Sequence, residues 1–535
     1  MDDNQNQPQM QEAENQQETG TIFSSEQQTS EQPSQQADPL QQPLEAQQPQ
    51  TTKPEEVAPE VQSPEGITGG PPPDYFSDLP PVYEQNTNKW IFIIGGLVFF
   101  LIIFGLFYFF FLKDRLGGSG GGTSSKNEAV TISWWGLWEG KEVYDSVIQD
   151  YQSKNSNVTI NYEKVSQDQY RERLIARSKT GNGPDIFTFH NTWLPEMGEV
   201  ATPLPQEIMS NETFNNTFYP IHQKDLSIDG NYYGIPFTVD GLILIYNEEL
   251  LNQAGIVSPP TTWVGNQDDV LTIASKLTVK DASGKLVTAG LAIGTAENVE
   301  HFSELYGVLL LLNGGNLDNL NDSSAKEALE LYRSFAEKGL WDADMPNSIS
   351  AFTQGRVAMI IAPSWEVLVI KSQNPDLVVK TAPLPKGLND NRISLASYWV
   401  EGVNKYSPHQ LEAWKFLAFV SQKEELQKIY DAQSQTRLFG SAFSRVDMAD
   451  LLTNNQYLES VVTQAGNDEY VSFPVVGRTF DNGLNDEIVT YLKNAINQTI
   501  NGVDYANALS TAQSGIQQTK QKFTPTAETP SPAAQ

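Results

Sequence analysis

Residues 130–189 read VTISWWGLWEGKEVYDSVIQDYQSKNSNVTINYEKVSQDQYRERLIARSKTGNGPDIFTF, and their apolar side chains alternate between two spacings. Three short, largely β-branched runs have the period of strands and lie at residues 130–135, 158–162 and 185–189. Of the two intervening stretches, the first places Val143, Val147 and Tyr151 on one helical face, and the second covers 169–179. The order strand, helix, strand, helix, strand predicts a parallel α/β sheet with right-handed crossovers.

The segments after the first and third strands are the first candidates for a binding site. Ligands of such sheets bind at the carboxyl ends of the strands, which places residues 135–140 beside residues 189–193. Both segments are rich in aromatic and polar side chains. Trp134, within the first strand, is expected in the core, and Asp185 is expected to cap or brace its own strand.

Later helices carry recognisable ends. Ser324 and Glu327 match a capping box, and Gly339 supplies a left-handed stop to that helix. Another helix is expected to open at residues 407–410. About 400 residues of alternating elements predict two lobes within residues 128–520.

Both ends of the chain differ from this region in composition. Residues 1–89 are rich in Gln, Pro and Glu, with Lys53 and Lys89 as their only cations, and too few apolar side chains to offset chain entropy. We expect them to be disordered, and we expect the same of residues 521–535.

A second distinct region follows this tail. Residues 90–112 form an uninterrupted apolar run, long enough at 1.5 Å per residue to cross a hydrocarbon layer of about 30 Å. The sequence therefore predicts one transmembrane helix, followed by a Gly- and Ser-rich tether at 113–127. The run lacks the short core and cleavage site of a signal peptide.

Charge and cysteine content exclude several classes of function. Of the net charge of −32, residues 1–89 carry −14 and residues 123–535 carry −19, so a basic nucleic-acid footprint is missing. The chain has no Cys, which excludes disulfides, thiolate metal sites, a Cys nucleophile and a lipidated Cys anchor. We expect no metal and no cofactor.

Six segments in order resemble the bacterial extracellular solute-binding proteins of sugar-transporting ABC systems, of the maltose-binding type. They are TISWW (131–135), GPDIFTF (183–189), YYGIPFTVDGLILIYNEELLNQAGI (232–256), PPTTW (259–263), FTQGRVAMIIAPSW (352–365) and AWKFLAFV (413–420). The resemblance covers most of residues 128–520. It implies a two-lobed periplasmic-binding-protein-like fold of type II, with a hinge and an interlobe cleft.

The same resemblance implies a function without catalysis. A carbohydrate or similar polar solute would be captured by lobe closure and delivered to an ABC transporter permease, by a protein that is a monomer. Lys113 and Arg115 against Lys89 would weakly place the C-terminal domain in the cytoplasm. We expect the opposite, an extracytoplasmic domain and a cytoplasmic tail, because a solute receptor must face its solute.

The resemblance also indicates ligand-binding positions along the chain. They are Trp138, Glu139, His190, Asn191, Trp193, Asp240, His301, Trp365, Glu366, Tyr398 and Trp399. Indole rings can cover the apolar face of a pyranose, and a carboxylate can accept two sugar hydroxyls at once.

Three alternatives stay open. An anchored carbohydrate sensor or adhesion module would keep the fold without transport. A glycoside hydrolase would use two of Asp185, Asp240 and Glu366, which requires a paired separation of about 5 to 10 Å and one raised pKa. In the tail, Pro72-Pro73-Asp74-Tyr75 and Pro80-Pro81-Val82-Tyr83 match PPxY ligands, although a stiff spacer explains them as well.

Overall fold

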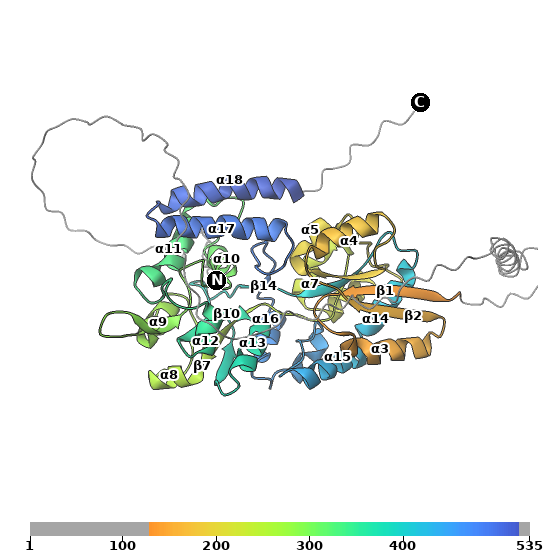
Figure 1. Ribbon diagram of the computed structural model, residues 1–535, viewed down its shortest axis with the longest axis horizontal. Helices are drawn as coiled ribbons and strands as arrows, with labels where there is room; N and C mark the ends of the chain where they lie inside the picture. The colour runs from red at the N-terminus through yellow and green to blue at the C-terminus, as the bar shows by residue number, and fades with distance from the viewer. Residues whose placement is uncertain (1–127, 524–535) are drawn as a thin grey trace, which may run out of the picture. The chain divides into compact units, whose positions relative to one another are not determined.

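The computed structural model describes residues 128–523. The residues expected to form the N-terminal tail, the predicted transmembrane helix 90–112 and the predicted tether 113–127 lie outside the described residues, as do residues 524–535. Among the described helices, none has both the length and the apolarity needed to span a membrane. Figure 1 shows the described part as two α/β halves, called here the first and second lobes.

The first lobe is built on a five-stranded sheet. Its strands in spatial order are β2 (Val158–Lys164), β1 (Val130–Gly136), β3 (Ile186–His190), β13 (Trp399–Val403) and β6 (Ile235–Pro236). The first three are parallel, whereas β13 runs antiparallel to both β3 and β6. The crossovers are α3 (Lys141–Lys154) and α4 (Tyr170–Lys179). The predicted order of strands and helices over residues 130–189 is therefore confirmed.

Helices cover both faces of this sheet. On one side α3 packs with α14 (Gln410–Val420) and α15 (Lys423–Thr436), and on the other lie α4, α5 (Leu194–Met197) and α7 (Pro220–Asp225) (Figure 1). Trp134 is fully buried, with its ring 4.5 Å from that of Tyr144 and 4.8 Å from that of Tyr162. The expectation that Trp134 belongs to the core is confirmed.

The second lobe contains the other five-stranded sheet. Its strands in spatial order are β11 (Val379–Ala382), β7 (Leu242–Asn247), β10 (Val357–Pro363), β9 (Leu286–Leu291) and β8 (Val279–Lys280). Its helices are α8 (Glu248–Gln253), α9 (Val270–Leu277), α10 (Phe302–Leu312), α11 (Ser323–Glu337), α12 (Ser348–Thr353) and α13 (Trp365–Gln373). Every residue of β10 is buried, as expected for a central strand covered on both faces.

The last two helices, α17 (Leu484–Ile500) and α18 (Tyr505–Phe523), form an antiparallel pair that packs on α10 and α11 (Figure 1). Helix α18 continues to Phe523, three residues beyond the expected domain end at 520. The remaining elements are short: η2 (Asn191–Trp193), α6 (Asn211–Thr217), β4 (Ser227–Ile228), β5 (Asn231–Tyr232), β12 (Ser394–Leu395), η3 (Val446–Leu451), α16 (Glu459–Gly466) and β14 (Tyr470–Val471).

The cap of α11 differs from the predicted capping box. Asp322 is the N-cap, and its carboxylate accepts a hydrogen bond from the Ser324 backbone N–H at 3.1 Å. Glu327 instead accepts from the side-chain amide of Asn313. Asp is favoured at this position because its negative charge also complements the helix dipole. The predicted stop at Gly339 is confirmed by its φ of 65°.

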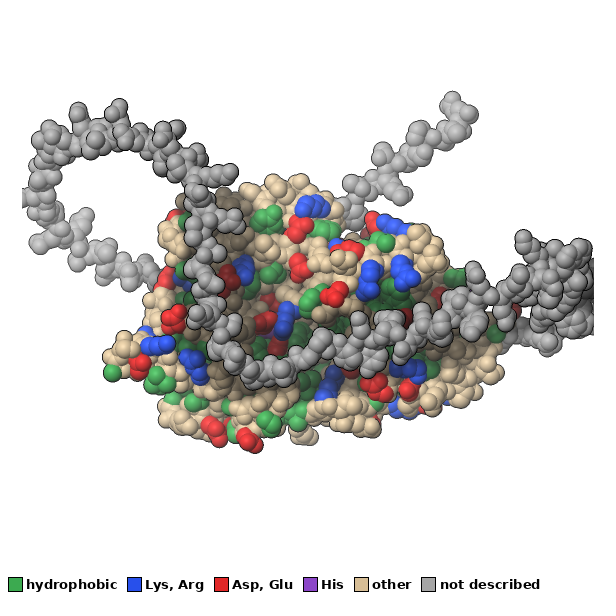
Figure 2. Space-filling model, viewed as in Figure 1, with side chains coloured by type: hydrophobic (Ala, Val, Ile, Leu, Met, Phe, Trp, Pro, Cys, Tyr) green, Lys and Arg blue, Asp and Glu red, His purple; other side chains and the backbone are tan. Residues whose placement is uncertain are grey.

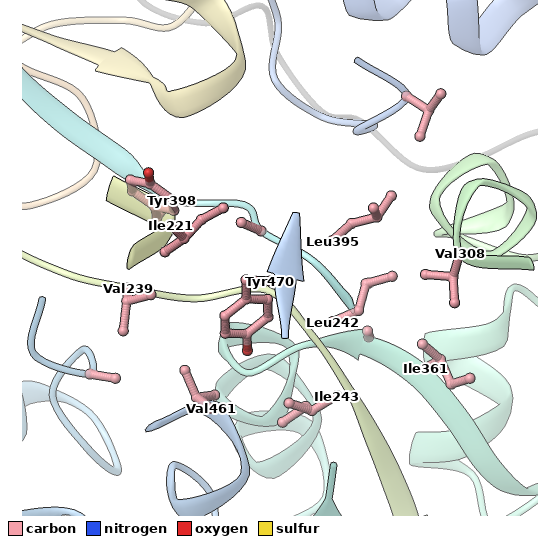
Figure 3. Close-up of a cluster of buried hydrophobic side chains, with 14 of the residues drawn as sticks. Ile221, Val239, Leu242, Ile243, Val308, Ile361, Leu395, Tyr398, Val461 and Tyr470 are labelled. Carbon is pink, nitrogen blue, oxygen red and sulfur yellow. The ribbon is translucent and has the colours of Figure 1, made fainter. Parts of the chain in front are cut away.

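The lobes are connected by chain segments that cross between the two sheets. Residues 237–241 lead from β6 to β7, and residues 396–398 lead from β12 to β13, with a backbone bridge between Gly241 and Ala396. Figure 3 shows Tyr470 of β14 among the apolar side chains at this crossing, with Leu242, Leu395 and Val461 nearby. The buried apolar residues of both lobes form one continuous core.

Candidate functional site

Four of the predicted aromatic side chains meet at the strand ends of the first lobe. The Trp399 ring lies 5.2 Å from that of Trp138, 5.3 Å from that of Trp193 and 5.1 Å from that of His190. Trp399 opens β13 and pairs with His190 at the end of β3, while Trp138 lies just beyond β1. We call these four residues the aromatic cluster. The topology thus brings together the two segments that sequence reasoning placed side by side.

The members of the aromatic cluster differ in their access to solvent. Trp138 is 40% exposed and Trp399 is half-buried, whereas Trp193 and His190 are each only 1% exposed. Within this structure only the first two can present a ring face to a ligand. The buried Trp193 ring packs against the Trp399 ring, and it therefore supports Trp399 without offering a surface of its own.

His190 is held as a neutral ring. Its Nδ1 lies 2.8 Å from the hydroxyl of Thr192 and its Nε2 lies 3.1 Å from that of Ser397. Burial disfavours the imidazolium and lowers the pKa of His190 to about 3, although the charge of Asp481 opposes this. Both ring nitrogens are thus engaged by hydroxyl groups that fix the orientation of the ring.

Asn191 and Tyr398 meet at a carboxylate that sequence reasoning missed. The side-chain amide of Asn191 and the hydroxyl of Tyr398 each donate to Asp225 at 2.8 Å. Asp225 is 8% exposed, and burial raises its pKa to about 7 in spite of these hydrogen bonds and one with Ser472. Asn191 and Tyr398 are therefore held inside the lobe, where they support the strand ends.

Glu139 is paired within the first lobe. Its carboxylate accepts a hydrogen bond from Gln433 at 2.7 Å and forms an ion pair with Arg437 at 2.9 Å. Both partners belong to α15 or the residue after it. The pair ties the loop after β1 to this helix and so positions Trp138, the preceding residue.

Asp240 lies on the segment that crosses from β6 to β7. Its two carboxylate oxygens accept from the backbone N–H of Gly241 at 2.7 Å, from the backbone N–H of Ser364 at 3.1 Å and from the Ser364 hydroxyl at 2.6 Å. Burial raises the pKa of Asp240 to about 6 against these bonds. Because Ser364 is the N-cap of α13, Asp240 connects the segment that crosses between the lobes to the first turn of that helix.

Charged side chains gather at this first turn of α13 and the start of α10. His301 Nδ1 lies 2.9 Å from Glu304 and its Nε2 lies 3.8 Å from Glu366, while Arg478 pairs with Glu366 at 2.7 Å and with Glu300 at 3.0 Å. We call these five residues the ion cluster. The side chains of His301, Glu304 and Glu366 are 2%, 3% and 1% exposed.

The buried charges of the ion cluster stabilise one another. Burial alone would lower the pKa of His301, but Glu304 and Glu366 outweigh it and raise the pKa to about 10. Burial opposes ionisation of the Glu304 and Glu366 carboxyls, yet the neighbouring His301 lowers the pKa of each below its ordinary value. His301 is therefore an imidazolium between two carboxylates. The Trp365 ring is half-buried and lies 6.4 Å from the His301 ring.

The segment from Gly477 to Asn482 contacts both lobes, and sequence reasoning missed it. Its Arg478 joins the ion cluster, the Gly477 N–H donates to Glu304 at 3.0 Å, and the Phe480 ring lies 6.1 Å from Trp138 of the aromatic cluster. The sequence GRTFDNG at 477–483 could have indicated an irregular segment with polar and aromatic side chains, because a Gly stands at each end of it.

The carboxylates required by the hydrolase alternative are each engaged. Asp185 accepts from the backbone N–H and the hydroxyl of Ser133, both at 2.7 Å, and from Ser407, which confirms that it braces its strand. Glu366 pairs with two cations, and its lowered pKa opposes the role of a general acid. Within residues 128–523, no three or more His, Asp or Glu side chains are grouped in a way that could hold a metal ion.

A bacterial family model covers much of this region. The model described as bacterial extracellular solute-binding protein matches residues 146–441, more than half of the chain, and the chain belongs to this family. A binding protein of Brucella abortus (strain 2308) is 26% identical over 292 residues, 52% of this chain and 69% of that protein. A maltotriose-binding protein of Pyrococcus abyssi is 22% identical over 303 residues, 54% of this chain and 61% of that protein.

Solved structures share the fold. A cyclo/maltodextrin-binding protein complexed with maltotetraose superposes with a TM-score of 0.61 at 18% identity, covering 75% of this chain and all of that one. The sugar-binding protein MalE from Xanthomonas citri gives 0.60 at 18% identity, covering 73% and 98%. The chain therefore has the mixed α/β fold of the two-lobed, maltose-binding type, as the resemblance implied, and the family consists of binding proteins.

Proposed function

We propose that residues 128–523 capture a carbohydrate between the lobes, with Trp138 and Trp399 stacking on its apolar face. The observation that carries this proposal is the exposed Trp138 ring, which is braced edge-on by Trp399 at the end of two strands. An indole left open at a strand end offers the flat surface that a pyranose needs. Two of the similar structures hold saccharides, maltotetraose in one and mannobiose in the other, and this is the class of ligand proposed here.

The ion cluster supplies the polar side of the proposed site. The exposed guanidinium of Arg478 and the carboxylate of Glu300 can both meet sugar hydroxyls, while Glu366 stays buried beneath them. Trp365 lies at the same helix start and is the second-lobe counterpart of Trp138 in this proposal. Asp240 acts here by holding Ser364, the residue before Trp365, since its own oxygens are already engaged.

Closure of the lobes on the solute is the proposed mechanism. A ligand can shift an open and closed equilibrium only through its differential affinity for the two states. The segment 477–482 already touches both candidate clusters, so a solute that contacts Trp138 and Arg478 together favours the state in which they are close. No bond is made or broken in this process.

The proposal extends to transport. The family is extracellular, which supports an extracytoplasmic position for the domain, with residues 90–112 as its anchor and an ABC permease as its partner. Protease treatment of intact cells should cleave the domain and spare the N-terminal tail. Deletion of the gene should abolish uptake of the bound sugar, whereas loss of a response alone would indicate the sensor.

A binding experiment tests the core of the proposal. Full-length protein should show ligand-dependent thermal stabilisation with members of a panel of malto-, manno- and other neutral saccharides, and calorimetry should then give Kd. Trp138→Ala should weaken binding about fivefold with little change in melting temperature, because stacking of one ring is worth about 1 kcal/mol.

The matched control is Trp135→Ala. Trp135 is a neighbouring half-buried indole on β1, but its ring packs under the Arg177 guanidinium at 5.4 Å and away from the aromatic cluster. It should leave the Kd unchanged. If no saccharide of the panel stabilises the protein, the proposed carbohydrate function is wrong. If a saccharide binds but Trp138→Ala leaves its Kd unchanged, the proposed stacking role of Trp138 is wrong.

A further inference from the structure

The part of the chain that follows β14 contacts both lobes. Helices α17 and α18 pack on α10 and α11 of the second lobe, and α18 runs from there toward α4 and α5 of the first lobe (Figure 1). The segment before α17 is also fixed to the second lobe, because Arg478 pairs with Glu366 and Glu300. Residues 477–523 are therefore anchored on the second lobe and reach across to the first.

The first point of contact with the first lobe is a buried hydrogen bond. The side-chain amide of Asn485, in the first turn of α17, donates to the hydroxyl of Thr192 in η2 at 2.9 Å. Both residues are buried, so water does not compete for this bond. Asp481 is buried as well, and its carboxylate accepts from the same amide at 3.0 Å and orients it. The bond exists only while the two lobes are in contact here.

This hydrogen bond belongs to a chain of contacts that reaches the crossing segments. The Thr192 hydroxyl also lies 2.8 Å from Nδ1 of His190, whose Nε2 lies 3.1 Å from the hydroxyl of Ser397. Ser397 lies on the segment between β12 and β13, and its backbone N–H donates to the carbonyl of Asp240 at 2.9 Å. The first turn of α17 is thus connected to both segments that cross between the lobes.

The second point of contact is the close approach of Gly483 to an ion pair of the first lobe. Arg171 of α4 and Glu196 of α5 form this pair, and both side chains are buried. A Cβ atom at position 483 would lie 2.6 Å from a carboxylate oxygen of Glu196 and 2.9 Å from Nη2 of Arg171. Because glycine lacks this atom, the backbone before α17 can lie directly against the pair.

The third point of contact lies at the end of α18. The Phe523 ring, in the last turn of this helix, lies 5.7 Å from the guanidinium carbon of Arg171. This distance is within the range of a cation–π interaction. Arg171 is therefore contacted by both ends of the helix pair, at Gly483 before α17 and at Phe523 in α18.

We infer that residues 477–523 form an interlobe clasp, which holds the two lobes together in the absence of any solute and must release the first lobe before a solute can enter. The clasp stays on the second lobe and separates from the first at Thr192 and at the Arg171–Glu196 pair. This inference goes beyond the capture proposed above, because it concerns the protein before solute binds and holds for any class of solute.

The chemistry of these contacts makes the clasp reversible. When the lobes separate, water replaces the lost partner of each polar group, so one neutral hydrogen bond favours the closed state only about fivefold. A cation–π contact favours it about threefold. Thr192 and Phe523 share no partner, so their effects should multiply to about fifteenfold. Such a bias determines the resting population and still permits opening.

Distances between spin labels on the two lobes test the clasp. The chain has no Cys, so Ala176→Cys on α4 and Glu330→Cys on α11, both at exposed positions, supply the labelling sites. Full-length protein without solute should show one dominant distance. Thr192→Val keeps the side-chain shape but removes the hydroxyl, and Phe523→Ala removes the ring. Together they should raise the ratio of a longer distance to the dominant one about fifteenfold, and singly about five- and threefold.

Tyr505→Ala is the matched control for Phe523→Ala. Tyr505 is a half-buried aromatic residue in the first turn of α18, and its hydroxyl contacts Glu337 of α11 in the second lobe. This variant should leave the distances unchanged. Gly483→Ala is an independent test, because the added methyl group meets the ion pair of the first lobe and should favour the longer distance. Gly466→Ala, which has open space, should not. Melting curves verify that each variant is folded.

The possible outcomes are distinct. The clasp is overturned if the double variant shows the same distances as the unaltered protein, or if the unaltered protein already shows mainly the longer distance. If Tyr505→Ala lengthens the distance as much as Phe523→Ala, loosening of α18 is the cause and the inference fails. None of these results involves a saccharide, so the proposed carbohydrate function is decided separately by the saccharide panel.

Discussion

Replacement of Glu401 by Gln should make the protein markedly less sensitive to pH. Glu401 lies on β13 in the middle of the first sheet, 6% exposed, and accepts from Trp134 Nε1 and from the Thr188 hydroxyl, each at 2.9 Å. No Lys or Arg in the described part of the chain forms an ion pair with it. Burial therefore raises its pKa from about 4.5 to about 7.

The sign and size of the effect follow from proton linkage. Between pH 4.5 and 7 the folded state retains a proton on Glu401 that the unfolded chain has lost. The stability that this one group contributes is therefore greatest below pH 4.5 and declines as the pH rises to about 7. A tenfold change in proton affinity is worth about 1.4 kcal/mol, which makes the decline about 3 kcal/mol for this group. The uncharged amide in Glu401→Gln cannot contribute to it.

Urea denaturation of full-length protein at pH 4.5, 6 and 8 measures the effect. The free energy of unfolding of Glu401→Gln, relative to the unaltered protein, should rise by about 3 kcal/mol across this range. Other buried groups, such as Asp225 and His222, titrate equally in both proteins and cancel. Glu163→Gln, an exposed carboxyl on β2, serves as the control. A relative stability that stays constant within about 0.5 kcal/mol would refute the reasoning.

Two further substitutions probe packing and buried charge. His301→Gln leaves the carboxylates of the ion cluster without their buried cation and should lower the unfolding free energy by about 3 to 5 kcal/mol, part of which a second change, Glu304→Gln, should restore. A cost below about 1 kcal/mol would show that His301 is not charged. Gly290→Ala would overlap the backbone of Ala274 and should cost about 1 to 3 kcal/mol, whereas Gly198→Ala has open space and should cost under about 0.5. Equal melting temperatures for the two glycine variants would contradict this packing.

Charged side chains of both signs are mixed on the face of the described part that Figure 2 shows. Figure 2 shows Lys and Arg side chains interspersed with Asp and Glu across the visible face, without a broad area of either sign. Charges of opposite sign also meet at the candidate site, where Arg478 forms ion pairs with Glu300 and Glu366. Arg478 and Glu300 thus offer a ligand both a donor and an acceptor of hydrogen bonds.

The candidate site was predicted unevenly. Trp138 is 40% exposed, Trp399 is half-buried, and Trp365 and Glu366 open the same helix beside His301. Their part in ligand binding stays a prediction. Those residues lie in motifs that can be recognised from neighbours in the chain. Arg478 and Phe480 were missed because they lie in an irregular segment that has no periodic signal. Asp225 was missed because it is a single acidic residue at the end of the short helix α7, and nothing in the local sequence indicates its buried partners.

Several of the residues expected at the ligand are engaged by other side chains of the first lobe. Asn191, Tyr398 and Glu139 make hydrogen bonds or ion pairs with groups in their own lobe, and these contacts position the strand ends. Motif matching finds positions near a ligand, but it does not distinguish a side chain that faces the ligand from one that orients its neighbour. That distinction depends on the rotamer and on partners supplied by other segments.

Local sequence determined the alternation of strands and helices from Val130 to His190, the burial of Trp134 and the left-handed stop at Gly339, because spacing and backbone preference act between near neighbours. Only the tertiary structure decided that Glu401 meets Trp134 across 267 residues, and that Arg478 meets Glu366 across 112. These contacts arise when separate elements pack, and burial then sets which carboxyl is protonated and which is charged.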